Sequence, residues 1–148
     1  MNPEDYVSYP IALALKKAGF DWKCDHYYTP EIYSEKYIEY PMLLWEKTAI
    51  NSNDIIYEGE RFSAPTLWQA QKWLREKWDL HIDVFPAGDC SFDADGHICE
   101  EWNYWNFDIM HVVSTRKIIE SEERYDSFEE VLSAGIAAAL ELIEKKGA

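Results

Sequence analysis

Residues 63–82 read SAPTLWQAQKWLREKWDLHI and predict a helix with a defined start, followed by a strand. Thr66 is suited to be the N-cap, because its hydroxyl can accept a hydrogen bond from the backbone N–H of Gln69. The Gln69 side chain can bond back to the N–H of Thr66 and complete a capping box. Pro65 disfavours helical backbone at the residue before it, so no earlier start is expected. We therefore predict a helix over Leu67–Trp78.

This helix has one broad apolar face, which we expect to lie in the core. Trp68 falls outside that face, beside Lys72 and Arg75. Trp68 therefore either packs at the edge of the core or is exposed for a partner, and it is a candidate binding residue. The core face consists of Leu67, Ala70, Trp73, Leu74 and Trp78.

A second helix is predicted near the C-terminus, where Ser127 is suited to be an N-cap and Glu130 can complete a capping box. The helix should continue to about Lys145. Gly135 lies in the middle of its apolar side, although a glycine inside a helix costs up to about 1 kcal/mol relative to alanine. Gly135 therefore predicts a close approach to the sheet, and Gly135→Leu should destabilise the fold. The apolar side consists of Phe128, Val131, Leu132, Gly135, Ala139 and Leu142.

Three strands are expected between the two helices. The first is His81–Phe85, ended by Pro86 and Gly88, the second is Trp102–Val113, and the third lies within Arg116–Glu122. In the second strand, alternation directs one set of side chains inward, namely Trp105, Phe107, Ile109 and Val113. The predicted fold class is α+β: an antiparallel sheet of three or more strands packed by helices, with an α-β-β-β-α unit in the C-terminal half.

This order of elements matches the topology of a double-stranded-RNA-binding domain. Such domains bind RNA partly through basic side chains at the start of the last helix. In this chain the corresponding turn carries Asp126, Glu129 and Glu130. The topology therefore implies a fold and does not imply RNA binding.

The N-terminal portion also begins with a helix. Ser8 is suited to cap it, the helix should run to about Ala18, and Gly19 is placed to end it in a left-handed conformation. The later elements are less regular in pattern. We expect a strand at Cys24–Thr29, a helix beginning after Pro41, a turn at Asn51–Asp54 and a short strand at Ile55–Tyr57.

The composition is that of one acidic domain. The chain has 148 residues, of which 47% are hydrophobic and 16% aromatic, enough for a substantial core. We expect a single domain over residues 1–148, with an N-terminal portion at 1–60 and a helix-sheet-helix unit at 61–148. The net charge of −14 repels phosphate backbones and anionic membranes. Direct binding to nucleic acid or membrane is disfavoured, which leaves a protein partner or a homo-oligomer to consider.

The sequence also favours a cytoplasmic location. Residues 1–5 are polar and acidic, unlike a secretory signal. No apolar stretch approaches the roughly 20 residues that span a bilayer. The three cysteines lack paired C-x-x-C spacing, which fits free thiols in a reducing compartment.

Residues 89–101 read DCSFDADGHICEE and contain the densest group of potential metal ligands. Aligned to an EF-hand loop they supply Asp93 and Asp95, but Ser91 and Trp102 occupy the first and twelfth ligand positions. Asp95-Gly96 is more simply a hairpin turn between two strands. The candidate binding residues of this loop are Asp93, Asp95 and His97.

A zinc site in the same loop would use Cys90, His97 and Cys99, with Cys24 as a fourth ligand. Their spacing matches no familiar structural zinc site. We therefore predict no metal and no cofactor.

No catalytic residue is predicted. The four histidines are scattered, no G-x-S-x-G context marks a nucleophile, and the six glycines form no phosphate-binding loop. With 28 carboxylates, acidic pairs arise by chance, so a general acid and base cannot be assigned. The sequence favours a protein that is not an enzyme.

Three stretches resemble a group of small uncharacterised proteins of phages and prophages of Bacteroides-type gut bacteria. The first stretch is Tyr6-Val7-Ser8 with Ala14, Leu15, Lys16, Gly19, Phe20 and Cys24. The second is Ala64-Pro65-Thr66-Leu67 through Gln71–Glu76 to His81-Ile82, and the third is Tyr125–Gly135. Together they cover less than half of the chain. The group brings no activity, cofactor or catalytic residue.

These observations support one leading hypothesis and two alternatives. The leading hypothesis is a non-enzymatic accessory protein of phage or mobile-element origin that acts by binding another protein or itself. The first alternative is an acidic mimic of nucleic acid that inhibits a DNA-binding protein. The second is a small hydrolase or metal-dependent enzyme whose site is assembled from distant residues.

Overall fold

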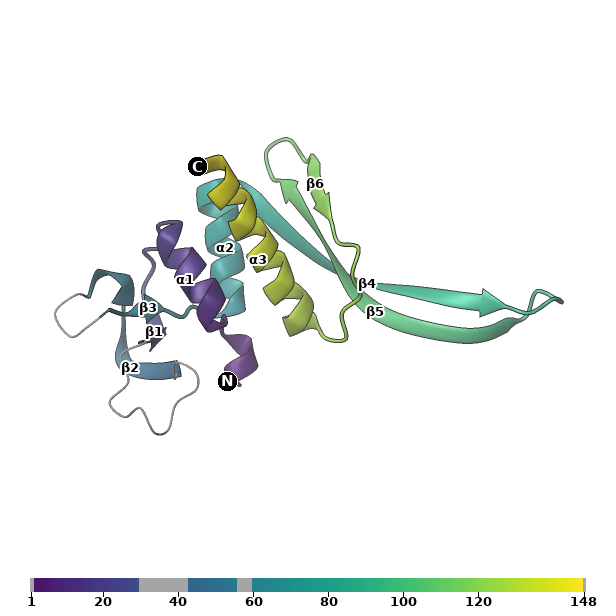
Figure 1. Cartoon of the computed structure of the whole chain (residues 1–148), viewed down its shortest axis with the longest axis horizontal. Coiled ribbons are helices and arrows are strands. Elements are labelled where there is room, and N and C mark those ends of the chain that lie inside the picture. Colours follow the sequence, from purple (N-terminus) through teal and green to yellow (C-terminus); the bar gives the residue numbers. More distant parts are fainter. Residues whose placement is uncertain (1, 30–42, 56–59, 148) are drawn as a thin grey trace.

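In the computed structural model, which describes residues 2–29, 43–55 and 60–147, three α-helices lie between two three-stranded antiparallel sheets (Figure 1). The N-terminal sheet has the strand order β2-β1-β3. The C-terminal sheet has the order β4-β5-β6, and its first two strands extend far beyond the helices. The predicted α+β fold class is confirmed.

The N-terminal portion contains α1 and the first sheet. Its elements are a 3₁₀ turn η1 (Pro3–Asp5), α1 (Tyr9–Lys17), β1 (Cys24–Tyr28), β2 (Leu43–Ile50), a 3₁₀ turn η2 (Ser52–Asp54) and β3 (Phe62–Ser63). The C-terminal half contains the predicted α-β-β-β-α unit. Its elements are α2 (Leu67–Trp78), β4 (Leu80–Phe92), β5 (Ile98–His111), β6 (Lys117–Glu120) and α3 (Phe128–Gly147).

The start of α2 is fixed by the predicted capping box. The Gln69 N–H donates to Thr66 Oγ1 over 3.2 Å, and the Thr66 N–H donates to Gln69 Oε1 over 3.0 Å. The helix ends at Trp78, and the C-cap residue Asp79 adopts a left-handed conformation with φ of 55°. The predicted bounds of this helix are confirmed.

The cap of α3 is only half of the predicted box. The Glu130 N–H donates to Ser127 Oγ over 3.1 Å, as expected. The Glu130 carboxylate instead accepts a bond from the N–H of Asp126 over 3.4 Å.

The first helix, α1, follows Ser8 and precedes Gly19, whose φ is 92°, as predicted. Ser8 makes no side-chain cap bond, however.

The helix predicted to begin after Pro41 is wrong over the described residues, because Leu43–Ile50 form β2 and pair with β1. Trp45, Thr48 and Ile50 favour extended backbone, and β1 supplies the neighbouring strand. The predicted strand Cys24–Thr29 and the predicted turn at Asn51–Asp54 correspond to β1 and η2. The short strand predicted at Ile55–Tyr57 lies mostly outside the described residues.

The prediction that Pro86 and Gly88 end the first strand of the second sheet is also wrong. β4 continues through both residues to Phe92, and Pro86 lies opposite Trp105. The Trp105 N–H bonds Tyr125 on the side away from β4, so Pro86 and Trp105 form a pair without hydrogen bonds. Because β4 is also an edge strand, the missing N–H of Pro86 removes no hydrogen bond from the sheet.

The other two predicted strands of this sheet are present, and the bounds of β5 differ from those predicted. β5 begins four residues earlier than expected and ends at His111, so Val113 is not an inward residue but is 88% exposed. Trp105 is only half-buried, whereas Phe107 and Ile109 are buried as predicted. β6 lies within the predicted range.

A continuous core joins the three helices to the inner halves of β4 and β5. Trp78 was expected in this core but is 39% exposed, because it is the last residue of α2. On α3, Phe128 and Leu142 are half-buried, and Ile136, Leu140 and Ile143 are buried in addition to the predicted residues. Central core residues are Leu15, Leu67, Trp73, Leu74, Ile82, Phe107, Ile109, Leu132 and Ile136.

Gly135 permits α3 to approach the second sheet closely, as its position in the sequence predicts. A Cβ atom at this position would lie 2.5 Å from Cγ2 of Ile82 and 3.4 Å from Cδ2 of Phe107. Both neighbours are buried, so neither has free space into which to move. The side of the sheet that carries Ile82 and Phe107 is therefore the helix side.

Candidate protein-binding surface

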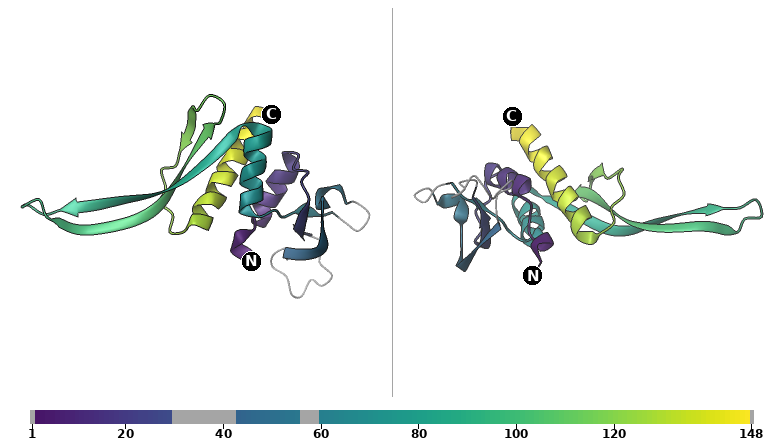
Figure 2. Two further views of the ribbon diagram at one scale, coloured as in Figure 1. Left: turned by 180° about the vertical axis from the view of Figure 1, so that it is seen from behind. Right: turned by 60° about the horizontal axis from the view of Figure 1, so that its bottom comes forward.

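The outer part of the β4–β5 hairpin projects away from the helices in every view (Figures 1 and 2). We call residues 86–104 the arm. Its strands remain paired from Pro86 opposite Trp105 at the base to Ser91 opposite Glu100 near the tip. Beyond a one-residue irregularity, Phe92 pairs with Ile98. Among the described residues, the arm is thus a two-stranded ribbon with no third strand or helix along most of its length.

The helix side of the sheet continues along the arm to its tip. Side chains alternate between the two faces of a strand, so Phe92, ten residues after Ile82, lies on the same face. Ile98 shares that face because it is the direct partner of Phe92. The tip therefore carries an apolar pair on the face that the helices cover nearer the base.

The two residues of this pair are exposed. Phe92 is 62% exposed and Ile98 is 54% exposed. An isolated two-stranded hairpin is marginally stable in water, and exposed apolar side chains give it little of the stabilisation that burial provides. The tip therefore exposes two neighbouring large apolar side chains that nothing else in the described structure covers.

An aromatic cluster lies where the arm meets the helices. Phe128, the first residue of α3, stacks on Trp68 with ring centroids 5.3 Å apart. Phe128 also meets Trp105 edge to face, with centroids 5.5 Å apart. Trp68 remains 60% exposed. One ring face of Trp68 therefore packs at the edge of the core, while the rest of the side chain is exposed.

The opposite face of the arm is held by Arg124, in the segment between β6 and α3. Its guanidinium forms an ion pair with Asp89. It also lies 4.7 Å from the ring centroid of Tyr104 and 5.7 Å from that of Trp102. Asp89 and Trp102 are direct partners across the strands, so one arginine binds both strands of the arm.

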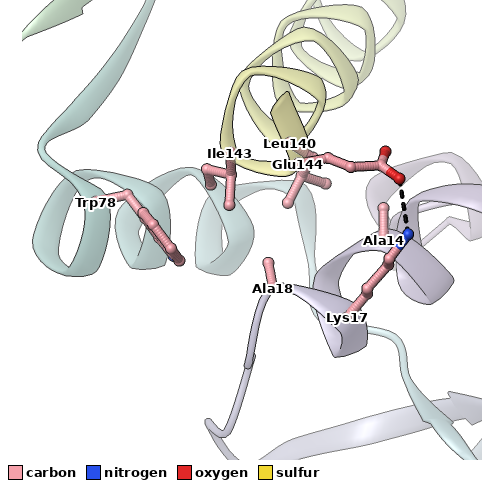
Figure 3. Close-up of a pocket in the computed structure, with 7 residues that line it drawn as sticks. All are labelled: Ala14, Lys17, Ala18, Trp78, Leu140, Ile143 and Glu144. Carbon is pink, nitrogen blue, oxygen red and sulfur yellow. Dashed lines mark hydrogen bonds and ion pairs between the residues drawn. The ribbon is translucent and has the colours of Figure 1, made fainter. Parts of the chain in front are cut away.

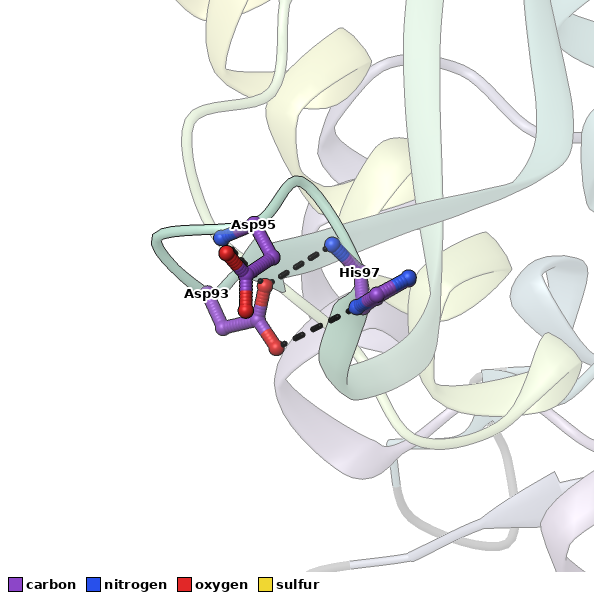
Figure 4. A group of neighbouring side chains, drawn as sticks. All are labelled: Asp93, Asp95 and His97. Atoms are coloured by element: carbon purple, nitrogen blue, oxygen red, sulfur yellow. Dashed lines mark hydrogen bonds and ion pairs between the residues drawn. The ribbon is translucent and has the colours of Figure 1, made fainter.

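The turn of the hairpin brings together Asp93, Asp95 and His97 (Figure 4). Their ligand atoms lie within 4.8 Å of one another, and all three side chains are exposed. Asp93 Oδ1 accepts hydrogen bonds from the N–H groups of Asp95 and His97, each 2.9 Å long. This carboxylate therefore closes the turn. Gly96 has φ of 82°, and the predicted hairpin turn at Asp95-Gly96 is confirmed.

The residues of the two metal hypotheses are not arranged as those hypotheses require. The EF-hand alignment is wrong because strands, not helices, flank the loop. Cys90 and Cys99 are exposed on the arm, whereas Cys24 is buried in the N-terminal portion. Burial, with a smaller contribution from Asp25, raises the pKa of the Cys24 thiol to about 12, which disfavours the thiolate that a metal needs.

A pocket of about 350 Å³ lies elsewhere, between the C-terminal parts of all three helices (Figure 3). The ring of Trp78 forms one wall. Lys17 and Glu144 face each other across the rim with 2.7 Å between Nζ and Oε1, and this ion pair lowers the pKa of Glu144. The remaining lining residues are Ala14, Ala18, Leu140 and Ile143. Apart from the Lys17–Glu144 ion pair at the rim, the lining side chains are apolar except for the indole N–H of Trp78.

One group of carboxylates crosses the second sheet away from the arm. Asp83, Asp108 and Glu120 are direct partners on neighbouring strands. Lys117 Nζ lies 3.0 Å from Asp108 Oδ2 and 3.9 Å from Glu120 Oε2. The bond to Asp108 raises the pKa of Lys117, so the lysine remains charged and compensates the buried carboxylate. Lys117 therefore pairs with two of these three carboxylates.

The sequence interpretation identified Trp68 and the turn residues but missed Phe92, Ile98, Arg124 and the contact with Phe128. A signal for the long ribbon was present. Asp95-Gly96 marks a turn, and the segments before and after a hairpin turn can pair with each other as two strands. Pro86 concealed this possibility, since a proline in a strand usually marks its end or an edge.

Comparisons with known proteins give no match to a family model, a curated protein or a solved structure. Among the residues that the structure describes, none of the helices has the length and apolar character to cross a membrane.

Proposed function

We propose that this protein is a non-enzymatic accessory protein, of the phage or mobile-element kind that its sequence resembles, and that it acts by binding another protein through the arm. The observation that carries the proposal is the exposed Phe92–Ile98 pair at the tip of the projecting ribbon. Full burial of such a side chain contributes roughly 1.5–3 kcal/mol. The pair can therefore act as the anchor of an interface.

The arm and the aromatic cluster together extend the candidate surface beyond the tip of the hairpin. A typical interface covers about 800 Å² on each partner, more than a hairpin tip provides. Trp68, Phe128 and Trp105 lie on the same face of the sheet as the tip pair. A partner placed in the angle between α3 and the arm would contact both regions, with Trp68 as a second large aromatic anchor.

Photo-crosslinking at the tip tests this proposal. A photoreactive phenylalanine analogue is placed at position 92, and in a second protein at position 113, which is 88% exposed and outside the arm. Each protein is irradiated in cells of the natural host or a related strain. We expect a discrete adduct from position 92 and none of the same mass from position 113.

Competition separates a specific complex from chance contact. Excess unlabelled wild-type protein should suppress the adduct, whereas protein with Phe92→Ser and Ile98→Ser should not. This double variant should melt like the wild type, because both side chains are exposed. Equal suppression by the wild type and the double variant, or no position-specific adduct at all, would exclude binding through the tip.

A further inference from the structure

The charges of the arm identify the chemistry of its partner. Building on the proposed function, we infer that the arm binds a protein surface rich in arginine and lysine that surrounds an apolar pocket for Phe92 and Ile98. The partner is thus the kind of protein that carries a basic face, as nucleic-acid-binding proteins do. A second copy of this acidic chain is not the expected occupant.

The arm carries acidic side chains and no basic ones other than histidine. Residues 86–104 contain five carboxylates and neither lysine nor arginine. Asp89 is paired with Arg124 from outside the arm. The other four are exposed, and within the described parts of the chain none pairs with a lysine or arginine. These four are Asp93, Asp95, Glu100 and Glu101.

The four carboxylates that pair with no lysine or arginine among the described residues lie around the apolar pair, on both faces of the ribbon. Glu101 lies opposite Cys90, on the face of Phe92. Glu100 lies opposite Ser91, on the other face, and Asp93 directly follows Phe92. An apolar centre with a charged rim is the usual arrangement of a protein interface. A complementary partner therefore has a pocket with cations around its edge.

The chain itself shows how an arginine binds to this ribbon. Arg124 pairs with Asp89 while its guanidinium lies over Tyr104 and near Trp102. A planar guanidinium can bond a carboxylate and stack on an aromatic ring at the same time, which an ammonium does less well. Near the tip, Phe92 and the carboxylate of Glu101, which lies diagonally across the ribbon on the same face, offer the same pair of groups to an arginine of the partner.

The net charge argues against a second copy as the occupant. At −14, two chains repel each other, and the arm would meet few cations on an identical molecule. Residues 120–130, beside the base of the arm, are also negatively charged. They contain six carboxylates and only one basic residue, Arg124. That arginine is already occupied by the arm of its own chain.

Selection from a displayed library of random peptides tests this inference. The immobilised wild-type protein and the Phe92→Ser, Ile98→Ser double variant are used in parallel, and only peptides that need the tip pair are kept. We expect these peptides to be enriched in arginine and in large apolar residues relative to the unselected library. Their binding should weaken as salt increases, because the exposed charges are screened.

A neutral-arm variant then isolates the carboxylates. It carries Asp93→Asn, Asp95→Asn, Glu100→Gln and Glu101→Gln. A control variant loses four exposed carboxylates elsewhere, through Glu4→Gln, Asp21→Asn, Asp54→Asn and Glu141→Gln. Both variants change the net charge from −14 to −10. For a selected peptide we expect about a tenfold or greater loss of affinity with the neutral arm and less than about a twofold loss with the control.

The outcomes separate this inference from the proposed function. Tip-dependent peptides without basic enrichment, or equal losses in the two charge variants, would overturn the basic partner and leave binding through the arm intact. An absence of tip-dependent peptides would count against both. A stable dimer of the wild type that the Phe92→Ser, Ile98→Ser variant cannot form would instead assign the arm to self-association and overturn the inference.

Discussion

The β4–β5 hairpin has two halves that share one ladder of paired residues and differ in what covers them. In the inner half, Ile82 and Ile109 are direct partners and are fully buried beneath the helices. In the outer half, Phe92 and Ile98 are also direct partners on the same face, and both are more than half exposed. The inner pair belongs to the core, and the outer pair is available to a partner.

This difference shows that strand pairing and burial are separate properties of the chain. Alternation of side chains continues through the whole hairpin, so the same face remains apolar at both ends. Only the inner end receives stabilisation from the removal of that surface from water. Changes in the inner half should therefore affect folding, and changes in the arm should affect binding.

The largest expected difference between the N-terminal portion and the arm is in the reactivity of their cysteine thiols. Cys90 and Cys99 are exposed on the arm, whereas Cys24 is 2% exposed in β1 and is held in its neutral form by a pKa of about 12. Labelling with N-ethylmaleimide, followed by mass spectrometry, should modify two thiols rapidly. Cys24 should react about 10³-fold or more slowly, through opening of the fold. Three equally fast thiols would contradict the burial of β1.

Gly135→Leu should produce the largest loss of stability. Its Cβ alone would approach Ile82 to 2.5 Å, so the larger side chain must force α3 away from the sheet. Overpacking of this kind costs about 3 kcal/mol or more, and the variant will fail to fold if the stability margin is smaller. Thermal melting followed by circular dichroism measures the loss. Ala137→Leu, at an exposed position of the same helix, is the control and should melt near the wild type.

Two isoleucines of β5 provide a direct test of the difference between the halves. Ile109→Ala should lower the free energy of unfolding by about 2–5 kcal/mol, because it leaves a cavity in the core. Ile98→Ala should change it by less than about 0.5 kcal/mol. Urea denaturation measures both on the same strand. Similar losses in the two variants would mean that the arm is part of the cooperative core.

Trp68→Ala should destabilise the fold less than Gly135→Leu or Ile109→Ala. It removes the stacking on Phe128, and aromatic pairs contribute about 0.5–1.5 kcal/mol beyond the area they bury. Trp45→Ala is the matched control, since Trp45 is 64% exposed on β2 and has no ring contact among the described residues. Equal unfolding free energies for the two variants would show that the Trp68–Phe128 stack does not stabilise the fold.

The helices of the C-terminal half could be predicted because their signals are local. Thr66 and Gln69 form a capping box within four residues, and Ser127 bonds the N–H of Glu130 three residues later. Gly135 predicted a close approach of α3 to the sheet, because a glycine inside a helix destabilises it unless close packing requires the absence of a side chain. β2 was mistaken for a helix because an apolar run beside a proline has no decisive period, and only pairing with β1 establishes the strand.

The candidate surface was harder to predict because its contacts join distant residues. The helical pattern placed Trp68 outside the core-facing side of α2. It could not predict that Trp68 stacks on Phe128, because Phe128 lies sixty residues later in the chain. Likewise, the acidic character of residues 89–101 was visible, whereas the pairing of Asp89 with Arg124 was not.

The sequence by itself determined where α2 and α3 begin, the order of elements from residue 67 to the C-terminal helix, and the excess of acidic charge. These properties depend on hydrogen bonds within one turn or on composition alone. The tertiary structure decided how far β4 and β5 extend beyond the helices, and that Phe92 and Ile98 meet on one exposed face. Strand pairing and coverage by helices bring together residues far apart in the chain, and no short stretch of sequence specifies them.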